Sequence, residues 1–292
     1  MHPAPSIIAF TTFSGLGFGL LAFLGAGFPN VTGWTALAFF TIAYLLATGG
    51  LIASALHLGN PQRALRAFTQ WRSSWLSREA ILAVAALLTM AAYGAALVFA
   101  HQRLPLLGLL GTALSLATVF ATSMIYAQLK SVPRWNHWTT PALFLALSLS
   151  GGAAFAGQAR LATVLMLATG ALQIATWWLG DPRFTARGTT IATATGLGSI
   201  GTVRSFALPH TGTNYLLKEM VYRVARKHAL RLRFIALVLT SLLPAALLAA
   251  APNHIGGALA LVSHITGTLT ARWLFFAEAE HVVGLYYGAH AG

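Results

Sequence analysis

The sequence predicts an all-helical protein that crosses a membrane several times, and three observations lead to this fold class. Hydrophobic residues make up 57% of the 292 residues and charged residues only 8%, against roughly 25% charged residues in a soluble domain. Apolar stretches of about 20 residues, long enough to cross a bilayer as a helix, recur along the chain. Nearly all the charge lies between them. We therefore expect one polytopic, all-α membrane domain covering residues 1–292.

Eight segments are long and apolar enough to span. The start of the chain, MHPAPS, lacks the basic region of a cleavable signal peptide, so we expect the first span to be retained. The fifth and sixth spans are separated only by Gln158–Arg160 and should form a tight hairpin. The expected spans cover residues 7–28, 33–57, 79–100, 105–129, 140–157, 160–180, 232–251 and 255–277, with one long connection at 181–231.

The basic residues are divided very unequally between the two sides of the membrane. Eight spans place both termini on one side, together with connections 58–78, 130–139 and 181–231. Of the 18 Lys and Arg residues, only Arg103 and Arg160 fall on the other side. Because connections in the cytoplasm are enriched in Lys and Arg, we expect eight transmembrane helices with both termini cytoplasmic. This topology explains the net charge of +13 without a nucleic-acid partner.

The chain offers no obvious metal or haem site. It has no cysteine, which excludes thiolate metal sites and cysteine-ligated iron–sulfur clusters within it. His264 is the only histidine well inside a span, and at 1.5 Å per residue it lies about 20 Å deeper than His57. The two histidines therefore cannot flank one haem, and we expect neither haem nor metal in this chain.

The connection at 181–231 contains two patterns that could mislead. Gly196–Gly201 fits G-x-G-x-x-G, but a dinucleotide site needs that motif between a strand and a helix of a βαβ unit, which this connection cannot supply. Tyr215–Arg233 has apolar residues at helical spacing with basic residues between them. This pattern predicts a helix at the membrane surface, attracted to anionic lipid headgroups or to an acidic partner.

The connection between the second and third spans carries the most chemistry for its length. Asn60 followed by Pro61 favours a helix start, and Leu65, Phe68 and Trp71 would share one face of that short helix. Ser77 is expected to cap the third span, with Glu79 in its first turn. His57 ends the second span at a similar depth. A hairpin would thus gather an imidazole, a carboxylate and several guanidiniums around one recess.

Two interpretations of this recess remain open from the residues alone. The arginines are also typical of any cytoplasmic membrane border, Glu79 of any helix start, and His57 of an interfacial histidine. Taken together, however, His57, Glu79 and the arginines suit a quinone, which needs an apolar wall and groups that move protons as its ring gains or loses electrons.

Several segments resemble a known family. ASALHLGNPQRALRAF at residues 53–68, the following SREA, VPRWNHWTTP at 132–141 and ARWLFFAEAEHVVGLYYG at 271–288 are similar to the anchor subunits of dimethyl sulfoxide reductase, the DmsC family. The likeness runs nearly from end to end. It implies a haem-free, eight-helix subunit without a catalytic centre, in an oxidoreductase complex of the bacterial inner membrane. The implied partners are an iron–sulfur subunit, a molybdopterin catalytic subunit and membrane lipid.

The resemblance also implies which residues serve the quinone, either ubiquinone or menaquinone. It assigns quinone binding and proton relay to His57, Gly59, Arg63 and Glu79. Arg66, Trp71 and Arg272 are weaker additions from the residue pattern. None of these residues is expected to be catalytic in the substrate chemistry, which belongs to a partner.

The predicted orientation favours one branch of the resemblance. The charge bias places the partner subunits in the cytoplasm, and the last segment resembles the anchors of membrane-bound sulfite dehydrogenases. We therefore expect sulfite oxidation coupled to quinone reduction, with quinol oxidation for a dimethyl sulfoxide reductase as the alternative. A transporter is the alternative of another class, but it would place ionisable groups near the midplane, where only His264 lies. An anchor that merely tethers its partners also remains possible.

Overall fold

A computed structural model describes residues 2–56, 60–207, 209–210, 212, 214, 220 and 228–287. All regular structure in this part of the chain is helical, without a strand, which confirms the all-α class. It also leaves Gly196–Gly201 outside any βαβ unit in the described ranges. The segment 215–219 and residues 221–227, which hold most of the expected surface helix, lie outside the described residues.

A helix overlaps each of the eight expected spans. Helices α1 to α4 are followed by α5 and α6, by a composite helix of α9, η4 and α10, and by α11. Their bounds are α1 Pro5–Gly25, α2 Gly33–Ala55, α3 Trp75–Phe99, α4 Pro105–Ala127, α5 Thr139–Phe155, α6 Ala159–Gly180, α9 Ala229–Leu237, η4 Val238–Leu242, α10 Leu243–Ala250 and α11 His254–Ala277. Short connecting elements are η1 Pro61–Phe68, α7 Arg183–Ala186, α8 Ile191–Thr195 and η5 Val282–Tyr287.

Six helices of the described chain are both long and apolar enough to cross a membrane. They are α1, α2, α3, α4, α6 and the composite helix at 229–250. The helix α5 is apolar but has 17 residues, and α11, with 24 residues, carries the buried Arg272. Six helices are therefore candidate spans by length and composition. The count of eight stays a prediction, as does the side on which the termini lie.

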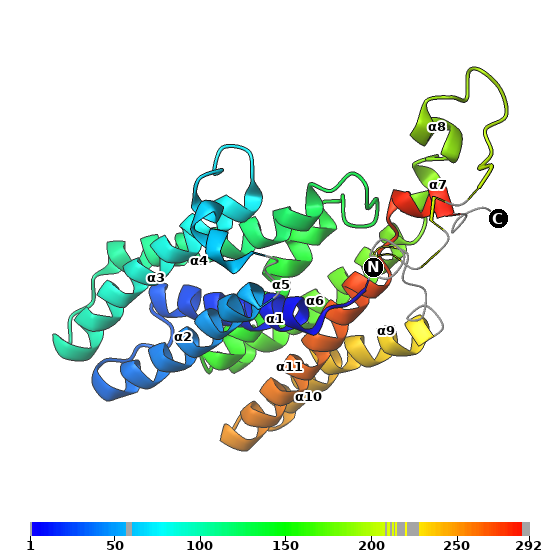
Figure 1. Ribbon diagram of the computed structural model, residues 1–292. Coiled ribbons are helices and arrows are strands. Elements are labelled where there is room, and N and C mark those ends of the chain that lie inside the picture. The colour runs from blue at the N-terminus through cyan, green and yellow to red at the C-terminus, as the bar shows by residue number, and fades with distance from the viewer. Residues whose placement is uncertain are drawn as a thin grey trace.

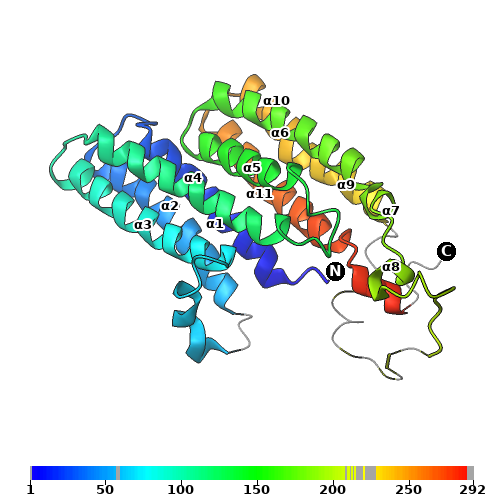
Figure 2. The same cartoon turned by 90° about the horizontal axis from the view of Figure 1, so that it is seen from above.

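The first helix is the centre of the bundle. It packs against α2, α4 and α5 and also touches α11, so it joins an N-terminal group, α1 to α4, to a C-terminal group of α5, α6, α9, α10 and α11 (Figures 1 and 2). Most of its residues are buried, because it is surrounded by other helices rather than by lipid. The turn between α5 and α6 is as tight as expected, with Gly157 at φ 67°.

Small residues let α1 approach its neighbours closely. A Cβ added to Gly19 would lie 2.1 Å from the carbonyl oxygen of Ser148 on α5, and one added to Gly17 would lie 2.3 Å from the backbone nitrogen of Ala47 on α2. This confirms the packing role expected for small residues in membrane helices. It is specific to position, since a Cβ on Gly15 would meet nothing within 4 Å.

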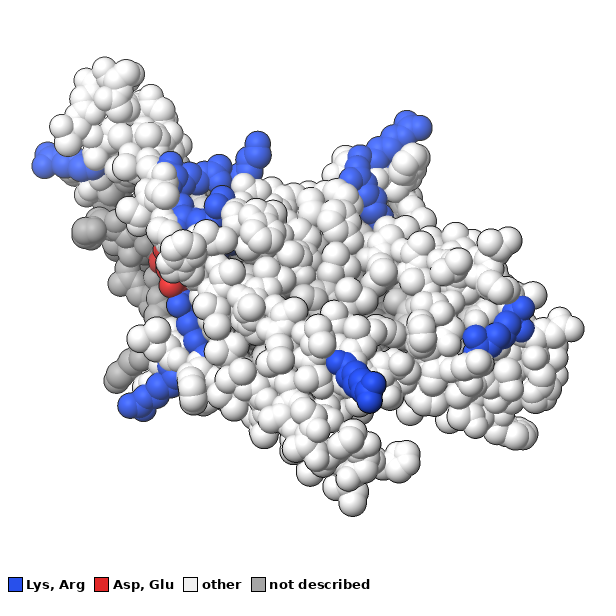
Figure 3. Space-filling view, turned by 180° about the vertical axis from the view of Figure 1, so that it is seen from behind, with Lys and Arg blue, Asp and Glu red and all other residues white. Residues whose placement is uncertain are grey.

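The outer surface of the bundle is suited to lipid. Large apolar side chains such as Leu45, Leu88 and Leu106 are mostly exposed, and an exposed apolar belt of this kind marks contact with an apolar phase. In Figure 3 most of the visible surface is uncharged, and the Lys and Arg side chains stand out as a few blue groups. The bundle therefore meets the lipid with its helices and confines most of its charge to the helix ends.

Connections far apart in sequence meet at one end of the bundle. Arg134 before α5 and Arg233 in α9 both bind Asp181 at the end of α6, and the amide of Val282 donates to the carbonyl of Ser131. Figure 1 shows α7, η5 and the start of α1 at this end. The structure thus places connections 130–138 and 181–186 on the same side as the last described residues, as the even number of expected spans requires.

Candidate functional site

The third helix begins earlier than the sequence predicts. Its first residue is Trp75 and its N-cap is Ser74, whereas Ser77, the expected cap, is buried inside the helix. The prediction of a Ser77 cap was therefore wrong. The Trp75 ring packs edge-on against Phe120 of α4, with centroids 5.9 Å apart, and the helix includes three further residues, 75–77. Glu79 consequently lies in the second turn rather than in the first.

Glu79 points into the protein. It is 4% exposed, and its Oε1 accepts a hydrogen bond of 2.5 Å from Oγ1 of Thr122 on α4. The same hydroxyl lies 3.0 Å from the carbonyl oxygen of Thr118, one turn earlier in α4. A buried carboxylate or carboxylic acid is rare unless it is paired or hydrogen bonded. The position therefore indicates a specific role rather than a helix-start preference.

The connection before α3 is more exposed than the predicted recess. Pro61–Phe68 forms the short helix that Asn60 and Pro61 predict, although it is a 3₁₀-helix and the Asn60 side chain makes no cap bond. Arg63, Arg66 and Trp71 are all exposed. The structure does not bring them to the Glu79 carboxylate.

Arg78 of α3 forms hydrogen bonds with the last residues of this connection. Its guanidinium donates to the carbonyl oxygens of Trp71 and Arg72, at 2.8 and 2.7 Å, and lies 4.4 Å from the centroid of the Trp75 ring. Cation–π contacts of this kind stabilise a guanidinium on an aromatic face. Arg78 is therefore engaged in structure. His57 and Gly59, the remaining residues of the predicted site, lie outside the described residues.

Arg272, one of the three weaker sequence-predicted site residues, has the most unusual environment. It is 2% exposed, and no hydrogen bond or ion pair joins it to another residue of the described chain; its buried Nε has no partner. Its Cζ lies 3.4 Å from the centroid of the Phe144 ring on α5. A buried cation without a carboxylate partner is costly in a low-dielectric interior. Such a group is expected at a site that serves a ligand or another buried charge.

An aromatic cluster packs around the Phe144 ring that Arg272 covers. Tyr126 of α4 packs against the rings of Trp135, Phe144, Phe275 and Phe276 at centroid distances of 5.3 to 5.8 Å. Thr122 and Tyr126 are one helical turn apart on α4, so they share a face. That face connects the acid on α3 with the cation on α11.

Thr122 and Tyr126 were not among the sequence-predicted site residues. Both lie in an apolar run where threonine and tyrosine are common, and no local motif distinguishes them. Their spacing of four residues predicts a shared helix face, but the sequence does not say that this face meets Glu79. That information comes only from how α3 and α4 pack.

Four charged side chains form a second cluster at the same end of the bundle. Glu278, 6% exposed in its side chain, accepts from Nε of Arg233 at 2.7 Å and lies 3.7 Å from Nη1 of Arg134. Asp181 binds the same two arginines at 2.6 and 2.7 Å. Hydrogen bonding from Arg233, with a further contribution from Arg134, lowers the pKa of Asp181 from 3.8 to about 2. This cluster joins four segments and is a structural clamp.

His264 is a structural residue of the C-terminal helix group. It is fully buried, its Nδ1 lies 2.7 Å from the carbonyl oxygen of Thr240, and its Nε2 lies 3.4 Å from Oγ of Ser150. Both ring nitrogens are thus occupied by protein groups, which leaves neither free for an axial bond to iron. Within the described residues, no three His, Asp or Glu side chains are placed to hold a metal ion.

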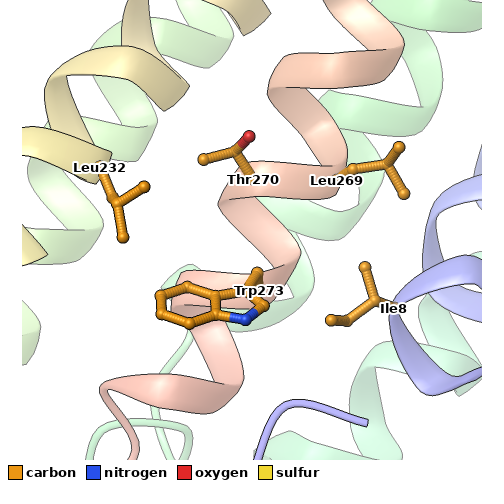
Figure 4. A pocket seen from close by; sticks show the side chains of 5 residues that line it. All are labelled: Ile8, Leu232, Leu269, Thr270 and Trp273. Atoms are coloured by element: carbon orange, nitrogen blue, oxygen red, sulfur yellow. The ribbon is translucent and has the colours of Figure 1, made fainter. Parts of the chain in front are cut away.

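An apolar hollow lies on another side of α11. It has a volume of about 360 Å³ and is lined by Ile8, Leu232, Leu269, Thr270 and Trp273. Figure 4 shows the Trp273 indole between Leu232 and Ile8. The lining has no titratable group, so the hollow suits an apolar chain and offers nothing for proton transfer.

The arrangement at α3, α4 and α11 can bind and move a proton but cannot store electrons. Glu79 offers a carboxyl group, Thr122 and Tyr126 offer hydroxyls, and Arg272 offers unsatisfied N–H donors. A quinone head group fits this donor set, because its carbonyl oxygens accept hydrogen bonds and its flat ring packs on aromatic side chains. The orphaned Nε of Arg272 is the observation that supports this fit.

The chain is similar to known membrane anchor subunits. Residues 18–288, which include Glu79, Thr122, Tyr126 and Arg272, match the family described as DMSO reductase anchor subunit (DmsC). The chain is also 33% identical to the C subunit of the sulfite dehydrogenase of Allochromatium vinosum, in an alignment that covers 98% of this chain and 99% of that protein. The chain belongs to the DMSO reductase anchor subunit family.

Proposed function

We propose that this chain is the quinone-reactive membrane anchor of a molybdopterin and iron–sulfur oxidoreductase. The observation that carries the proposal is the buried carboxyl group of Glu79, which is hydrogen bonded to Thr122. A membrane anchor that only tethered its partners would have no need of a buried acid on α3 and an unpaired buried arginine on α11. Membership of the anchor subunit family supports the same conclusion.

Each site residue has a role that its chemistry supports. Glu79 would exchange a proton with a quinone oxygen, and His57, which follows α2 in the sequence, would do the same. Gly59 would allow the backbone to approach the head group, because it has no Cβ. Arg63, with Arg66 and Trp71 as further contributors, would border the entrance at the membrane surface. Arg272 would supply positive charge from the far side.

A bound quinone takes up or releases two electrons and two protons. We propose that the electrons pass between the quinone and a partner subunit, since this chain has no cysteine to hold an iron–sulfur cluster. We propose that an iron–sulfur subunit docks over the basic end of the bundle and that the complex also contains a molybdopterin subunit. The positive-inside bias supports a cytoplasmic position for both partners.

The direction of electron flow that we propose is from sulfite to quinone. The support is the similarity to the sulfite dehydrogenase protein of Allochromatium vinosum over 98% of the chain, together with the predicted cytoplasmic orientation. The second candidate is a quinol-oxidising anchor for a dimethyl sulfoxide reductase, which the family description supports. Assays of membranes with sulfite and with dimethyl sulfoxide would separate the two candidates, since only one substrate should drive or accept electron transfer.

The experiment for the site compares two activities of one assembled complex. Glu79→Gln should abolish most quinone-linked electron transfer and leave substrate turnover with an artificial soluble electron acceptor unchanged, because the catalytic centre lies in another subunit. Arg160→Gln, which changes an exposed arginine at the start of α6 and at the end of the bundle away from the proposed docking surface, is the control and should leave both activities intact. Full quinone-linked activity in both Glu79→Gln and a His57→Gln variant would show that the chain is only a tether.

A further inference from the structure

Arg272 is enclosed by the protein without an acceptor for its charge. Its Nε is buried and unpartnered, and its only described stabilising contact is the face of Phe144, 3.4 Å from Cζ. An aromatic face offsets part of the cost of burying a guanidinium. A full negative charge nearby would offset more, because Coulomb interactions are strong in a low dielectric. The question is which acid supplies it.

The structure connects Arg272 to Glu79 through one face of α4. Thr122 donates to the Glu79 carboxyl group, and Tyr126 follows one turn later. The Tyr126 ring packs against Phe144, with centroids 5.8 Å apart, and Phe144 is the ring that Arg272 covers. Glu79 therefore lies next to Thr122, and Arg272 lies on the ring that packs against Tyr126. Thr122 and Tyr126 are neighbours on α4.

The other acids at this end of the bundle are already engaged. Asp181 and Glu278 bind Arg134 and Arg233, and neither forms an ion pair with Arg272. Glu280 also has a partner. Glu79 is thus the carboxyl group that the packing places on the path to Arg272.

We propose that Arg272 is a positioning residue that acts on Glu79 through Tyr126, so that acid, phenol and guanidinium work as one charge-balanced unit. Arg272 fixes Tyr126 and the Thr122–Glu79 hydrogen bond in the geometry that receives a quinone head group. This inference rests on the function proposed above. It assigns to Arg272 a role that depends on its charge and not only on its volume.

The test uses the complete complex with its partner subunits in detergent. The probe is 2-heptyl-4-hydroxyquinoline N-oxide, a fluorescent quinone analogue whose emission is quenched on binding. Arg272→Gln should weaken its binding about tenfold, the loss expected for one charge-assisted interaction, and Arg272→Lys should recover part of the affinity because it keeps the charge. Arg160→Gln, an exposed arginine at the start of α6 and away from the proposed docking surface, is the control and should bind the analogue normally.

Two further variants keep the proposal testable if Arg272→Gln does not assemble. Tyr126→Phe keeps the ring contacts and removes the hydroxyl, and it should also weaken analogue binding. In the double variant Glu79→Gln with Arg272→Gln, the loss should be no larger than that of the worse single variant, because coupled residues are not additive. Additive losses, or normal binding in Tyr126→Phe together with equal binding in Arg272→Lys and Arg272→Gln, would overturn the proposal.

The outcomes also separate this inference from the proposed function. If Glu79→Gln binds the analogue as tightly as the wild type, the quinone site at Glu79 is wrong, whatever Arg272 does. If Glu79→Gln binds weakly while Arg272→Gln and Tyr126→Phe bind normally, the quinone site stands and only the coupling to Arg272 fails.

Discussion

The hydroxyl of Thr122 on α4 lies 2.5 Å from the carboxyl oxygen Oε1 of Glu79 on α3. The bond joins two helices whose side chains are closed off from lipid at this point, since both residues are buried. It fixes the rotamer of the one acidic side chain that the sequence places within a membrane helix. Everything proposed for the site depends on this pair.

Thr122→Val should destabilise the protein and impair the site. The substitution keeps the shape of the side chain but removes a hydrogen bond to a charged or ionisable group, which costs about 2 kcal/mol. Thr118→Val is the control, because the Thr118 hydroxyl donates only to the carbonyl of Leu114 in its own helix. Thermal unfolding in detergent and quinone-linked activity should both separate the two variants. Equal behaviour would show that the Thr122–Glu79 bond contributes nothing.

Gly19→Ala should disrupt the contact between α1 and α5. The new Cβ would meet the carbonyl oxygen of Ser148, and forced overpacking of this kind costs about 1–3 kcal/mol. Gly15→Ala gains the same helix propensity in the same helix and meets no atom within 4 Å. It should therefore be neutral or stabilising. Thermal unfolding of the two variants measures the difference, and equal melting temperatures would contradict the close approach.

Glu278→Gln should loosen the junction between α9 and α11. The side chain of Glu278 is almost fully buried and accepts from Arg233 at 2.7 Å, so its neutralisation leaves a partly buried guanidinium with one fewer charged partner. Breaking a buried pair costs about 3 kcal/mol, reduced here because Asp181 remains bound to Arg233. Chemical unfolding should show the loss, whereas Arg187→Gln at an exposed position should change stability by less than about 0.5 kcal/mol.

The contribution of Asp181 to stability should disappear in acid. Its pKa falls from 3.8 to about 2 on folding because Arg233 and Arg134 bind the carboxylate. A lowered folded-state pKa stabilises the protein above the unfolded value, and that stabilisation is lost as the pH falls through the folded value. The difference in unfolding free energy between wild type and Asp181→Asn should be constant above about pH 4 and shrink towards pH 2. The effect is small, since the side chain is 47% exposed and solvent screens the pair.

The positions of the membrane helices could be predicted from the sequence because they depend on local hydrophobicity and length. Glu79 could be singled out because acids are rare in this chain. The burial of Glu79 could not be predicted, because it depends on the residue at which α3 begins. The helix begins at Trp75, whose ring packs on Phe120. The ion pairs of the four-charge cluster could not be predicted from the sequence either. Its members were correctly placed on one side, but their pairing depends on how four distant segments pack.

The burial of Arg272 also could not be predicted from the sequence. Its place near the end of a span made it one of several basic residues at the membrane border. Only the structure shows that its guanidinium is buried against Phe144 rather than directed to the surface. The roles of His57 and Gly59, which lie outside the described residues, stay predictions.

Photoaffinity labelling with an azido-quinone tests the central claim most directly. The assembled complex is irradiated with the label, digested and analysed by mass spectrometry, with excess unlabelled quinone as the competitor. The account predicts competed adducts on this chain, in residues 57–79 or near Tyr126 and Arg272, and their loss in Glu79→Gln. Competed adducts found only on a partner subunit, with none on this chain, would contradict it.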